Sequence, residues 1–401
     1  MMVLVLNAGS SSQKSCLYRL GDLLSDTLTD PLWAADLDWI ADGHGLLTVT
    51  SNGIKQELPI TPRDTALEVL LNTLIEGETR AINSFEEIDL VGHRVVHGGA
   101  KYNQATVITA EVKKAIADLI PLAPNHNPAH LAGIEAIEAL LPNVPQVAVF
   151  DTAFHTTIPE PAKVYPLPYQ WYEQGIQRYG FHGISHQYCA NRAAQILHKP
   201  LESLKIITCH LGNGCSLAAI RNGICIDTTM GFSPLEGLMM GTRCGSIDPQ
   251  ILLYLMQEFG LSIENVNRLL NQESGLKGVS GISGDMREIN QAIAAGNQRA
   301  TLALEVYIHR LKSSIGAMVA SLNGLDVLVF TGGVGENNAI AREKTCEGLS
   351  YLSLQLDLAK NQHHPVDQNI ATDNSSKAIL VIHTQEDWAI ALAAASKVRQ
   401  N

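Results

Sequence analysis

The sequence lacks the features that mark membrane, secreted and nucleic-acid-binding proteins. No apolar run approaches the length of a membrane span, and the N-terminal run, residues 3–6, ends at Asn7. This run is also too short for a signal peptide and has no basic flank. The chain carries 28 lysines and arginines against 40 acidic residues, and its net charge of −12 argues against nucleic acid and anionic membrane surfaces as partners. We therefore expect a cytoplasmic protein with no nucleic-acid or membrane partner.

Closely paired cysteines are missing as well. The chain has seven cysteines, an odd number, and Cys209, Cys215 and Cys225 lack the paired spacing of a zinc site. Reduced thiols are therefore expected. With 401 residues, 46% of them hydrophobic, the chain can bury a large core and is too long for one ordinary domain, so two domains are expected.

Small, glycine-rich turns, in contrast, follow apolar runs at three places. Residues 7–12, 210–214 and 331–337 each follow a short apolar, β-branched run and carry an amide or hydroxyl side chain. Such turns expose several backbone N–H groups with no Cβ in the way, which suits a polyphosphate. Because they occur in both halves of the chain, they predict a nucleotide held in a cleft between two related domains.

Expected strands and helices alternate along the chain, which favours an α/β fold. Residues 88–96 and 147–150 are typical of buried strands, and Thr109 is suited to cap a helix over residues 109–119. Four prolines within residues 159–168 argue against regular structure and indicate a domain boundary. The second half repeats the plan, with these expected elements: strands at 205–209, 327–330 and 379–382, a hairpin over 217–226, and helices near 251–259, 300–322 and 385–398. The last helix is expected to pack on the first domain.

Arg94 and Asp151 stand out because both belong to apolar surroundings. An arginine within a largely apolar strand has to pair its charge, either in a structural ion pair or with an anionic ligand. The glycines that follow Arg94 open space beside it and favour the ligand. Asp151 directly follows an expected strand, where a carboxylate can hold a metal, orient a cation or simply cap a turn.

Further polar candidates lie in glycine-flanked segments. His182 and His186 have the spacing of a zinc-binding helix but lack its glutamate, so a hydrogen bond from His182 to a phosphoryl oxygen is the better interpretation. Arg243 lies on a glycine-rich loop, where it is either an exposed turn residue or the partner of Arg94 in clamping a phosphoryl group. Glu386 lies in a segment that fits a helix capping box, yet its carboxylate could approach a metal.

The first glycine turn offers hydroxyls and an ammonium group for phosphate contact. Ser10, Ser12 and Lys14 carry these groups, and a plain hairpin turn is the alternative.

Taken together, the chain resembles the acetokinase family of the actin-like, sugar-kinase-like superfamily. The likeness runs over nearly the whole chain, through these segments: 7–12, the segment around Arg94, 151–155, 179–183, 210–214, 234–243 and 333–337. It implies an α/β fold of two duplicated actin-like ATPase domains, with mixed sheets flanked by helices, around a nucleotide cleft. Residues 1–153 with the C-terminal helix 385–401 would form the acyl and phosphate side, and residues 154–384 the nucleotide side.

The resemblance also implies an activity. The family reversibly transfers the γ-phosphoryl group of ATP to acetate by direct in-line transfer, giving acetyl phosphate and ADP, with Mg²⁺ or Mn²⁺ and as a homodimer. Acetate is already ionised near neutral pH, so the reaction needs charge cancellation and alignment rather than a strong base. We therefore expect Asp151 to order metal-bound water or a neighbouring cation.

Positions that match the family's motifs carry the implied roles. Asp151, His182 and Arg243 match catalytic positions, and Arg94 matches the acetate contact. The pocket around the acetate methyl group is matched by Val96, Phe181 and Pro234, and the magnesium positions by Asn7 and Glu386. The implied nucleotide contacts are Lys14, Ser10, Ser12, His210, Leu211, Gly212, Asn213, Gly214, Asp285, Met286, Arg287, Gly333, Val334, Gly335, Glu336 and Asn337.

The sequence departs from the family's pattern at several positions. Asn125 replaces a leucine near the acyl pocket, Met286 replaces a phenylalanine near the adenine, and Asp387 follows the matched Glu386 where glutamate is usual. Propionate kinase activity is therefore an alternative. More distant alternatives are an actin-like or Hsp70-like nucleotide switch, which would lack the two arginines, and a zinc hydrolase built on His182 and His186.

Overall fold

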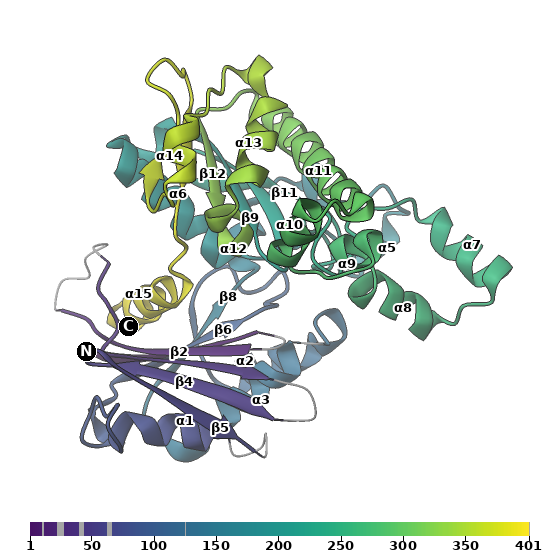
Figure 1. Cartoon of the computed structure of the whole chain (residues 1–401). Coiled ribbons are helices and arrows are strands. Elements are labelled where there is room, and N and C mark those ends of the chain that lie inside the picture. Colours follow the sequence, from purple (N-terminus) through teal and green to yellow (C-terminus); the bar gives the residue numbers. More distant parts are fainter. Residues whose placement is uncertain (10–11, 22–27, 40–43, 62–65, 125, 401) are drawn as a thin grey trace. The chain divides into compact units, whose positions relative to one another are not determined.

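The computed structural model describes residues 1–9, 12–21, 28–39, 44–61, 66–124 and 126–400. The chain divides into two compact units (Figure 1). The first unit comprises Met1–Ala153 and Gln385–Asn401, and the second comprises Phe154–Thr384.

The strands of the first unit form one mixed sheet in the order β5-β4-β3-β2-β1-β6-β8-β7. Strands β1 to β5 are antiparallel neighbours, whereas β6 runs parallel to β1 and β8 runs parallel to β6. The strands are β1 (Met2–Ala8), β2 (Ser12–Arg19), β3 (Trp33–Trp39), β4 (Gly45–Ser51), β5 (Ile54–Ile60), β6 (Leu90–Val95), β7 (Thr106–Val107) and β8 (Gln146–Phe150). Strands β1 and β2 pair directly, so the first glycine turn connects two antiparallel neighbours in the sheet.

Four α-helices belong to the described part of the first unit, and α3 and α15 pack on its sheet. They are α1 (Ala66–Ile75), α2 (Ala110–Asp118), α3 (Asn127–Leu140) and α15 (Glu386–Arg399). The Thr109 side chain caps α2 by accepting a hydrogen bond from the Val112 backbone N–H, as its position predicts. Helix α15 comes from the far end of the chain and packs on β1 and β6, as expected of the closing helix.

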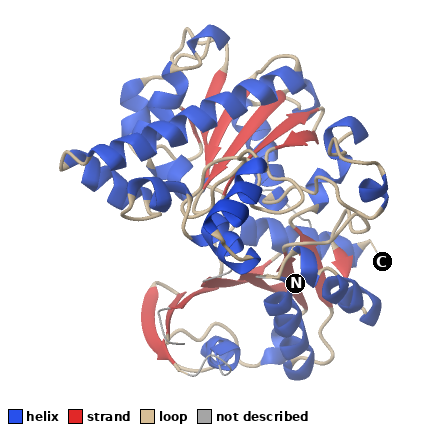
Figure 2. Cartoon of the chain, turned by 90° about the vertical axis from the view of Figure 1, so that its right-hand side faces the viewer, coloured by secondary structure: helices blue, strands red, loops and turns tan. Residues whose placement is uncertain are grey.

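The second unit is built on a sheet in the order β11-β10-β9-β12-β14-β13. Its strands are β9 (Lys205–Leu211), β10 (Cys215–Arg221), β11 (Ile224–Thr228), β12 (Val327–Thr331), β13 (Gln368–Asn369) and β14 (Ala378–Val381). Neighbouring β10 residues face opposite sides, so the Cys215 thiol reaches Tyr307 while the Ser216 hydroxyl reaches His186. The sheet therefore has helices on both faces, as Figure 2 shows.

The helices of the second unit include four long ones and several short ones among the described residues. They are α4 (Glu160–Lys163), α5 (Gln170–Glu173), α6 (Gly183–Leu197), α7 (Gln250–Phe259), α8 (Ile263–Gln272), α9 (Gly275–Ser280), α10 (Met286–Ala294), α11 (Gln298–Leu322), α12 (Gly332–Asn337), α13 (Ala339–Glu347) and α14 (Leu358–Gln362). Helix α6 packs on β9 and β12, and helix α11 packs on β10.

The central strands of the two units share one arrangement. In the first unit the antiparallel strands β3-β2-β1 are followed by the parallel strands β6 and β8. In the second unit the antiparallel strands β11-β10-β9 are followed by the parallel strands β12 and β14. This repeated order supports the expected duplication more strongly than the sequence does, because the two halves have little residue similarity.

Two expectations about local structure are wrong. The third glycine turn is the short helix α12, which begins at Gly332 with a φ of 77°. A Cβ at Gly332 would lie 2.9 Å from the Leu211 carbonyl oxygen, so glycine is required where the chain turns from β12 into the helix. The proline-rich segment contains α4, because Pro161 lies in the first turn of that helix, where a missing N–H costs no hydrogen bond.

All seven cysteines are free thiols, as expected, and six of them are buried. In the described part of the chain, no helix is both long and apolar enough to cross a membrane.

Candidate functional site

In the first unit, Arg94 is held by Asp151. The Arg94 Nε and Nη2 atoms both donate to Oδ2 of Asp151, at 3.0 and 2.6 Å. Arg94 is at the end of β6 and Asp151 directly follows β8, so the parallel pairing of these strands brings the two side chains together. The Asp151 side chain is 2% exposed and the Arg94 side chain 14%. Arg94 therefore forms an ion pair with a carboxylate of its own unit, and this pair fixes the plane of the guanidinium group.

The third guanidinium nitrogen of Arg94, Nη1, faces the end of β1. Its Nη1 lies 3.4 Å from Oδ1 of Asn7 and 3.3 Å from the carbonyl oxygen of Ala8. Burial alone would lower the pKa of Arg94, but the carboxylates of Asp151 and Glu386 outweigh it and raise that pKa above its ordinary value. Arg94 is therefore a permanent cation in a half-closed polar site.

The start of α15 supplies the acidic side of the same site. Asn7 Nδ2 donates to Oδ1 of Asp387 at 2.8 Å, and the Cys16 thiol lies 3.8 Å from the other carboxylate oxygen. The expected capping box is wrong, because Gln385 is the N-cap residue and no side chain caps α15. Burial raises the pKa of Asp387, and its hydrogen bond from Asn7 opposes that rise. Asp387 thus orients Asn7 rather than capping the helix, a role that the sequence did not reveal.

In the second unit, His182 and Arg243 lie beside each other over Gly214. His182 precedes α6 in a left-handed conformation with φ of 57°, which turns its ring out of the helix. Its Nδ1 atom is 2.9 Å from the Ser216 hydroxyl oxygen. Arg243 Nη1 donates to the Pro234 carbonyl oxygen at 2.6 Å. Arg243 is half-buried, so the exposed-turn interpretation of this residue is wrong, and its burial lowers its pKa.

A second imidazole stacks on His182. The His182 and His210 ring centroids are 4.2 Å apart and the rings are tilted by 24°. His210 belongs to β9 rather than to a loop, and its Nδ1 atom is 2.8 Å from the Ser185 hydroxyl of α6. Two rings and one guanidinium group therefore line this part of the second unit.

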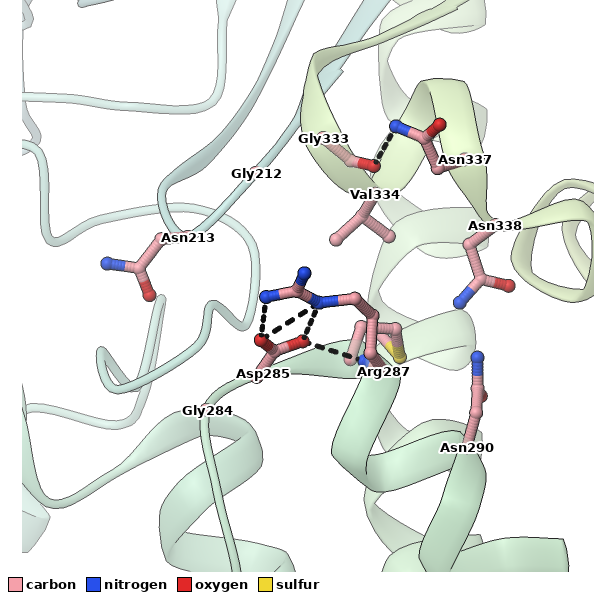
Figure 3. A pocket seen from close by; sticks show the side chains of 11 residues that line it. Gly212, Asn213, Gly284, Asp285, Arg287, Asn290, Gly333, Val334, Asn337 and Asn338 are labelled. Atoms are coloured by element: carbon pink, nitrogen blue, oxygen red, sulfur yellow. Dashed lines mark hydrogen bonds and ion pairs between the residues drawn. The ribbon is translucent and has the colours of Figure 1, made fainter. Parts of the chain in front are cut away.

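The second unit also contains a cavity of about 740 Å³ (Figure 3). Asp285 caps α10 by accepting from the Arg287 backbone N–H at 2.8 Å, and its carboxylate also binds the Arg287 guanidinium. In the first turn of α10, Met286 is buried and Arg287 is exposed. The hydrogen bond from Arg287 lowers the pKa of Asp285. The cavity is lined by Gly212, Asn213, Gly284, Asp285, Met286, Arg287, Asn290, Gly333, Val334, Asn337 and Asn338.

This cavity collects three separate segments that the sequence singled out: 212–213, 285–287 and 333–337. The remaining expected contacts in those segments do not line it. Glu336 accepts from the Gly332 backbone N–H at 2.9 Å and pairs with His383 at 2.5 Å. Leu211 is fully buried. His210, Gly214 and Gly335 are also absent from the lining.

Two asparagines in the cavity lining escaped sequence reasoning. Asn338 caps α13 through an Oδ1 that accepts from the Ala341 N–H at 2.9 Å, which leaves its Nδ2 free of that bond. Asn290 belongs to α10, and its Oδ1 is buried without a hydrogen-bond partner. Figure 3 shows both amides along one side of the cavity, with Asn213 on the other side of the Asp285–Arg287 pair in that view. The capping position of Asn338 was the signal available in the sequence.

The other expected site residues are distributed over both units. Lys14 is exposed on β2 opposite Asn7, and Ser12 begins the same strand. Val96 is buried in the first unit. Phe181 is buried in the second unit, where Pro234 is half-buried. Ser10 and Asn125 lie outside the described residues.

Comparison with known proteins places the chain in a family. The model of the acetokinase family matches residues 2–392 of the chain. The chain belongs to the acetokinase family. A protein of Rippkaea orientalis named acetate kinase is 62% identical over 395 residues, which cover 98% of each chain. Another, from Synechocystis sp., is 57% identical over 397 residues, covering 98% of this chain and 96% of that protein.

Solved structures of acetokinases have the same fold. The Porphyromonas gingivalis acetate kinase superposes with a TM-score of 0.90 at 43% identity, and 99% of each chain is covered. A propionate kinase from Francisella tularensis gives a TM-score of 0.89 at 38% identity, covering 98% of this chain and 99% of that one. These likenesses confirm the expected α/β fold with mixed sheets flanked by helices.

Gly214 offers a test of the His182–Arg243 arrangement in this acetokinase. An alanine methyl group there would lie 2.9 Å from Arg243 Nη2 and 3.4 Å from His182 Nε2. The flexible end of Arg243 can shift, so we expect the Gly214→Ala variant to keep its melting temperature but to lose about tenfold in kcat. Gly133→Ala is the matched control, because a methyl group there meets nothing within 4 Å. Unchanged kcat in Gly214→Ala would show that the position of Arg243 does not matter for turnover.

Proposed function

We propose that this protein reversibly transfers the γ-phosphoryl group of ATP to acetate, forming acetyl phosphate and ADP. Curated relatives at 56–62% identity over nearly the whole chain bear the name acetate kinase. The observation that carries the proposal is that the Asp151 carboxylate is paired with Arg94. One of its oxygens accepts two hydrogen bonds from Arg94, so the carboxylate orients a cation instead of standing ready to take a proton. A hydroxyl acceptor would need such a base, whereas acetate arrives ionised.

In this reaction two anions have to approach each other. Arg94 binds the acetate carboxylate, and its guanidinium plane is set by Asp151, so that the attacking oxygen is aligned with the phosphorus. His182 and Arg243 donate hydrogen bonds to the equatorial oxygens of the phosphoryl group as it transfers. The bond from phosphorus to the ADP oxygen breaks as the bond to the acetate oxygen forms, and no proton changes place.

The cavity of the second unit is the proposed binding site for the nucleoside of ATP. Its volume of about 740 Å³ suits a ligand of that size. Asn213, the 285–287 segment and the 333–337 segment are the proposed contacts, and Lys14, Ser10, Ser12 and His210 are proposed to bind phosphate oxygens. On this basis, residues 154–384 form the nucleotide side and the first unit the acyl and phosphate side.

The first unit also offers a donor set that suits Mg²⁺. The side-chain oxygen of Asn7 and the carboxylate of Glu386 are hard ligands of the kind that Mg²⁺ binds together with water and phosphate, and Mn²⁺ accepts the same set. Asp387 holds the Asn7 amide in a fixed orientation, which fits a ligand role. When bound, the metal neutralises charge on the phosphate oxygens.

Val96, Phe181 and Pro234 are the proposed walls around the acetate methyl group. We further propose a cytoplasmic enzyme whose acetyl phosphate serves the synthesis of acetyl-CoA.

A hydroxylamine-trapping assay tests this function directly. With ATP and Mg²⁺, we expect acyl hydroxamate to form faster from acetate than from propionate or butyrate at equal concentration. A maximum with propionate would instead assign the activity named for the Francisella tularensis structure. ATP hydrolysis without hydroxamate from any acid would refute the proposed acceptor and favour a nucleotide switch.

The proposed homodimer has a testable surface on α7 and the start of α8. No residue of α7 is buried, and the apolar side chains of Tyr254, Phe259 and Ile263 are 56%, 67% and 70% exposed. An exposed apolar area of this kind is typical of an interface, and we propose a second copy of the chain as its partner. In sedimentation, we expect the wild type at twice 43.3 kDa and a Phe259→Asp, Ile263→Asp double variant at 43.3 kDa. Leu140→Asp, at an exposed site in the first unit, is the control; a monomeric wild type would contradict the proposal.

A further inference from the structure

A chain of hydrogen bonds leads from the interior of the second unit to His182. Ser216 Oγ lies 2.9 Å from His182 Nδ1 and 2.7 Å from His186 Nε2. His186 Nδ1 in turn lies 2.7 Å from Thr208 Oγ1. Thr208, His186 and Ser216 are fully buried. The i, i+4 spacing of the two histidines, which first pointed to zinc, therefore places both rings on a single serine hydroxyl.

The fold explains why these groups meet. Thr208 on β9 and Ser216 on β10 face the same side of the sheet, because Ser216 pairs with His210 and side chains two residues apart in a strand share a face. Helix α6 packs on that side and carries His186 one turn after His182.

The donor and the acceptor in each of these hydrogen bonds follow from which hydroxyl and ring nitrogen atoms carry a proton. Within the described residues, His186 Nδ1 is the one partner of the buried Thr208 hydroxyl, so the hydroxyl must donate to it. Burial, together with His155 and His210, lowers the pKa of His186 well below its ordinary value, so the ring is neutral and carries its proton on Nε2. That N–H donates to Ser216, and the Ser216 hydroxyl is then left to donate to His182 Nδ1.

We propose that Thr208, His186 and Ser216 form a one-way relay that fixes His182 as the neutral tautomer with its proton on Nε2. Ser216 is a positioning residue in this relay. Only the role of His182 in phosphoryl transfer rests on the proposed function. The fixed Nε2–H is a hydrogen-bond donor beside Arg243, where both groups border Gly214. Charge stabilisation by His182 then comes from an aimed N–H group, while Arg243 supplies the positive charge.

The relay also opposes protonation of His182. If His182 carried a second proton on Nδ1, Ser216 would accept hydrogen bonds from both histidines and its own hydroxyl proton would have no acceptor. If the relay reversed instead, the hydroxyl proton of Thr208 would have no acceptor. Unpaired buried donors are unfavourable. Arg243 acts in the same direction, because its cationic end borders Gly214 beside His182.

Nitrogen-15 NMR of the histidine-labelled wild-type protein tests the tautomer without relying on catalysis. We expect the His182 ring, assigned by its loss in a His182→Gln variant, to show a protonated Nε2 and an unprotonated Nδ1 at neutral pH. A proton on Nδ1, or a charged ring, would overturn the proposal. Because this measurement needs neither acetate nor ATP, it stays informative even if the hydroxamate assay refutes the proposed acceptor.

The Ser216→Ala variant tests the consequence for turnover. We expect kcat to fall about tenfold, the equivalent of one neutral hydrogen bond, with the KM for ATP unchanged. The acid limb of the pH–kcat profile should move upward by about one unit, because protonation of His182 is no longer opposed. Thr345→Val is the matched control, since it removes a buried hydroxyl that donates to the Ala341 carbonyl in α13. An unmoved acid limb in a folded Ser216→Ala variant would reduce Ser216 to a structural role.

Discussion

The Arg94→Lys variant is expected to lose about a hundredfold to a thousandfold in kcat/KM for acetate, even though it keeps the positive charge. The Nε and Nη2 atoms of Arg94 both donate to one oxygen of Asp151, and these two hydrogen bonds fix the direction of the other N–H groups of the guanidinium. A lysine ammonium group is a point charge on a flexible stem and cannot keep two fixed donors on Asp151 while presenting others to a carboxylate. Hydroxamate assays at varied acetate concentration measure kcat/KM for the wild type and the variant.

The control for this substitution is Arg268→Lys. Arg268 also pairs with a carboxylate, Glu273, at 2.8 Å, but its side chain is 57% exposed and lies outside the proposed site. We expect the control to retain its activity, because exposed ion pairs contribute little. An Arg94→Lys enzyme within a few-fold of the wild type would show that charge alone serves the acceptor, and would remove the geometric argument for Arg94.

Asp151→Asn is expected to weaken both activity and stability. The amide cannot neutralise the charge of Arg94, whose side chain is only 14% exposed, so the free energy of unfolding should fall by about 3 kcal/mol. We expect kcat to fall by about a hundredfold because the guanidinium is no longer fixed. Urea unfolding and the hydroxamate assay measure the two effects separately.

The pH profile of this variant distinguishes orientation from base catalysis. If Asp151 orients Arg94, the Asp151→Asn enzyme keeps the shape of the wild-type profile at a lower rate. Loss of one limb of the profile would instead identify Asp151 as a proton acceptor and contradict the proposed acceptor chemistry. Asp118→Asn, which breaks an exposed pair with Lys114, is the matched control.

Local elements were accessible from the sequence because they depend on neighbours along the chain. The cap at Thr109 was predicted from a hydroxyl followed by a helical pattern, and the short buried strands from β-branched runs. Where two local signals competed, prediction failed. Glycines after β12 were taken for a turn, yet Gly332 makes one sharp change of direction and the next residues continue as a helix. Similarly, Pro161 is compatible with α4 because it falls in the first turn.

The residue types of the candidate site could also be predicted, since glycine-rich segments and isolated charges can be recognised in the sequence. The partners of those charges could not be predicted. A helix capping box was expected in the segment around Glu386, but the packing of α15 on β1 places the carboxylate of the next residue, Asp387, on Asn7, nearly the whole chain length away. Ser216 carried no signal at all, because a serine within a strand is unremarkable until a helix brings two imidazoles to it.

The sequence by itself determined the family, the α/β class and most of the residues proposed to act, because these follow from ordered motifs and from the periodicity of apolar side chains. Only the tertiary structure decided what each charged or polar group is bound to: Arg94 to Asp151, Asn7 to Asp387, and His182 through Ser216 to His186. The physical reason is that hydrogen bonds and ion pairs depend on distances of about 3 Å. Strand pairing and helix packing set those distances between residues that are far apart in the chain.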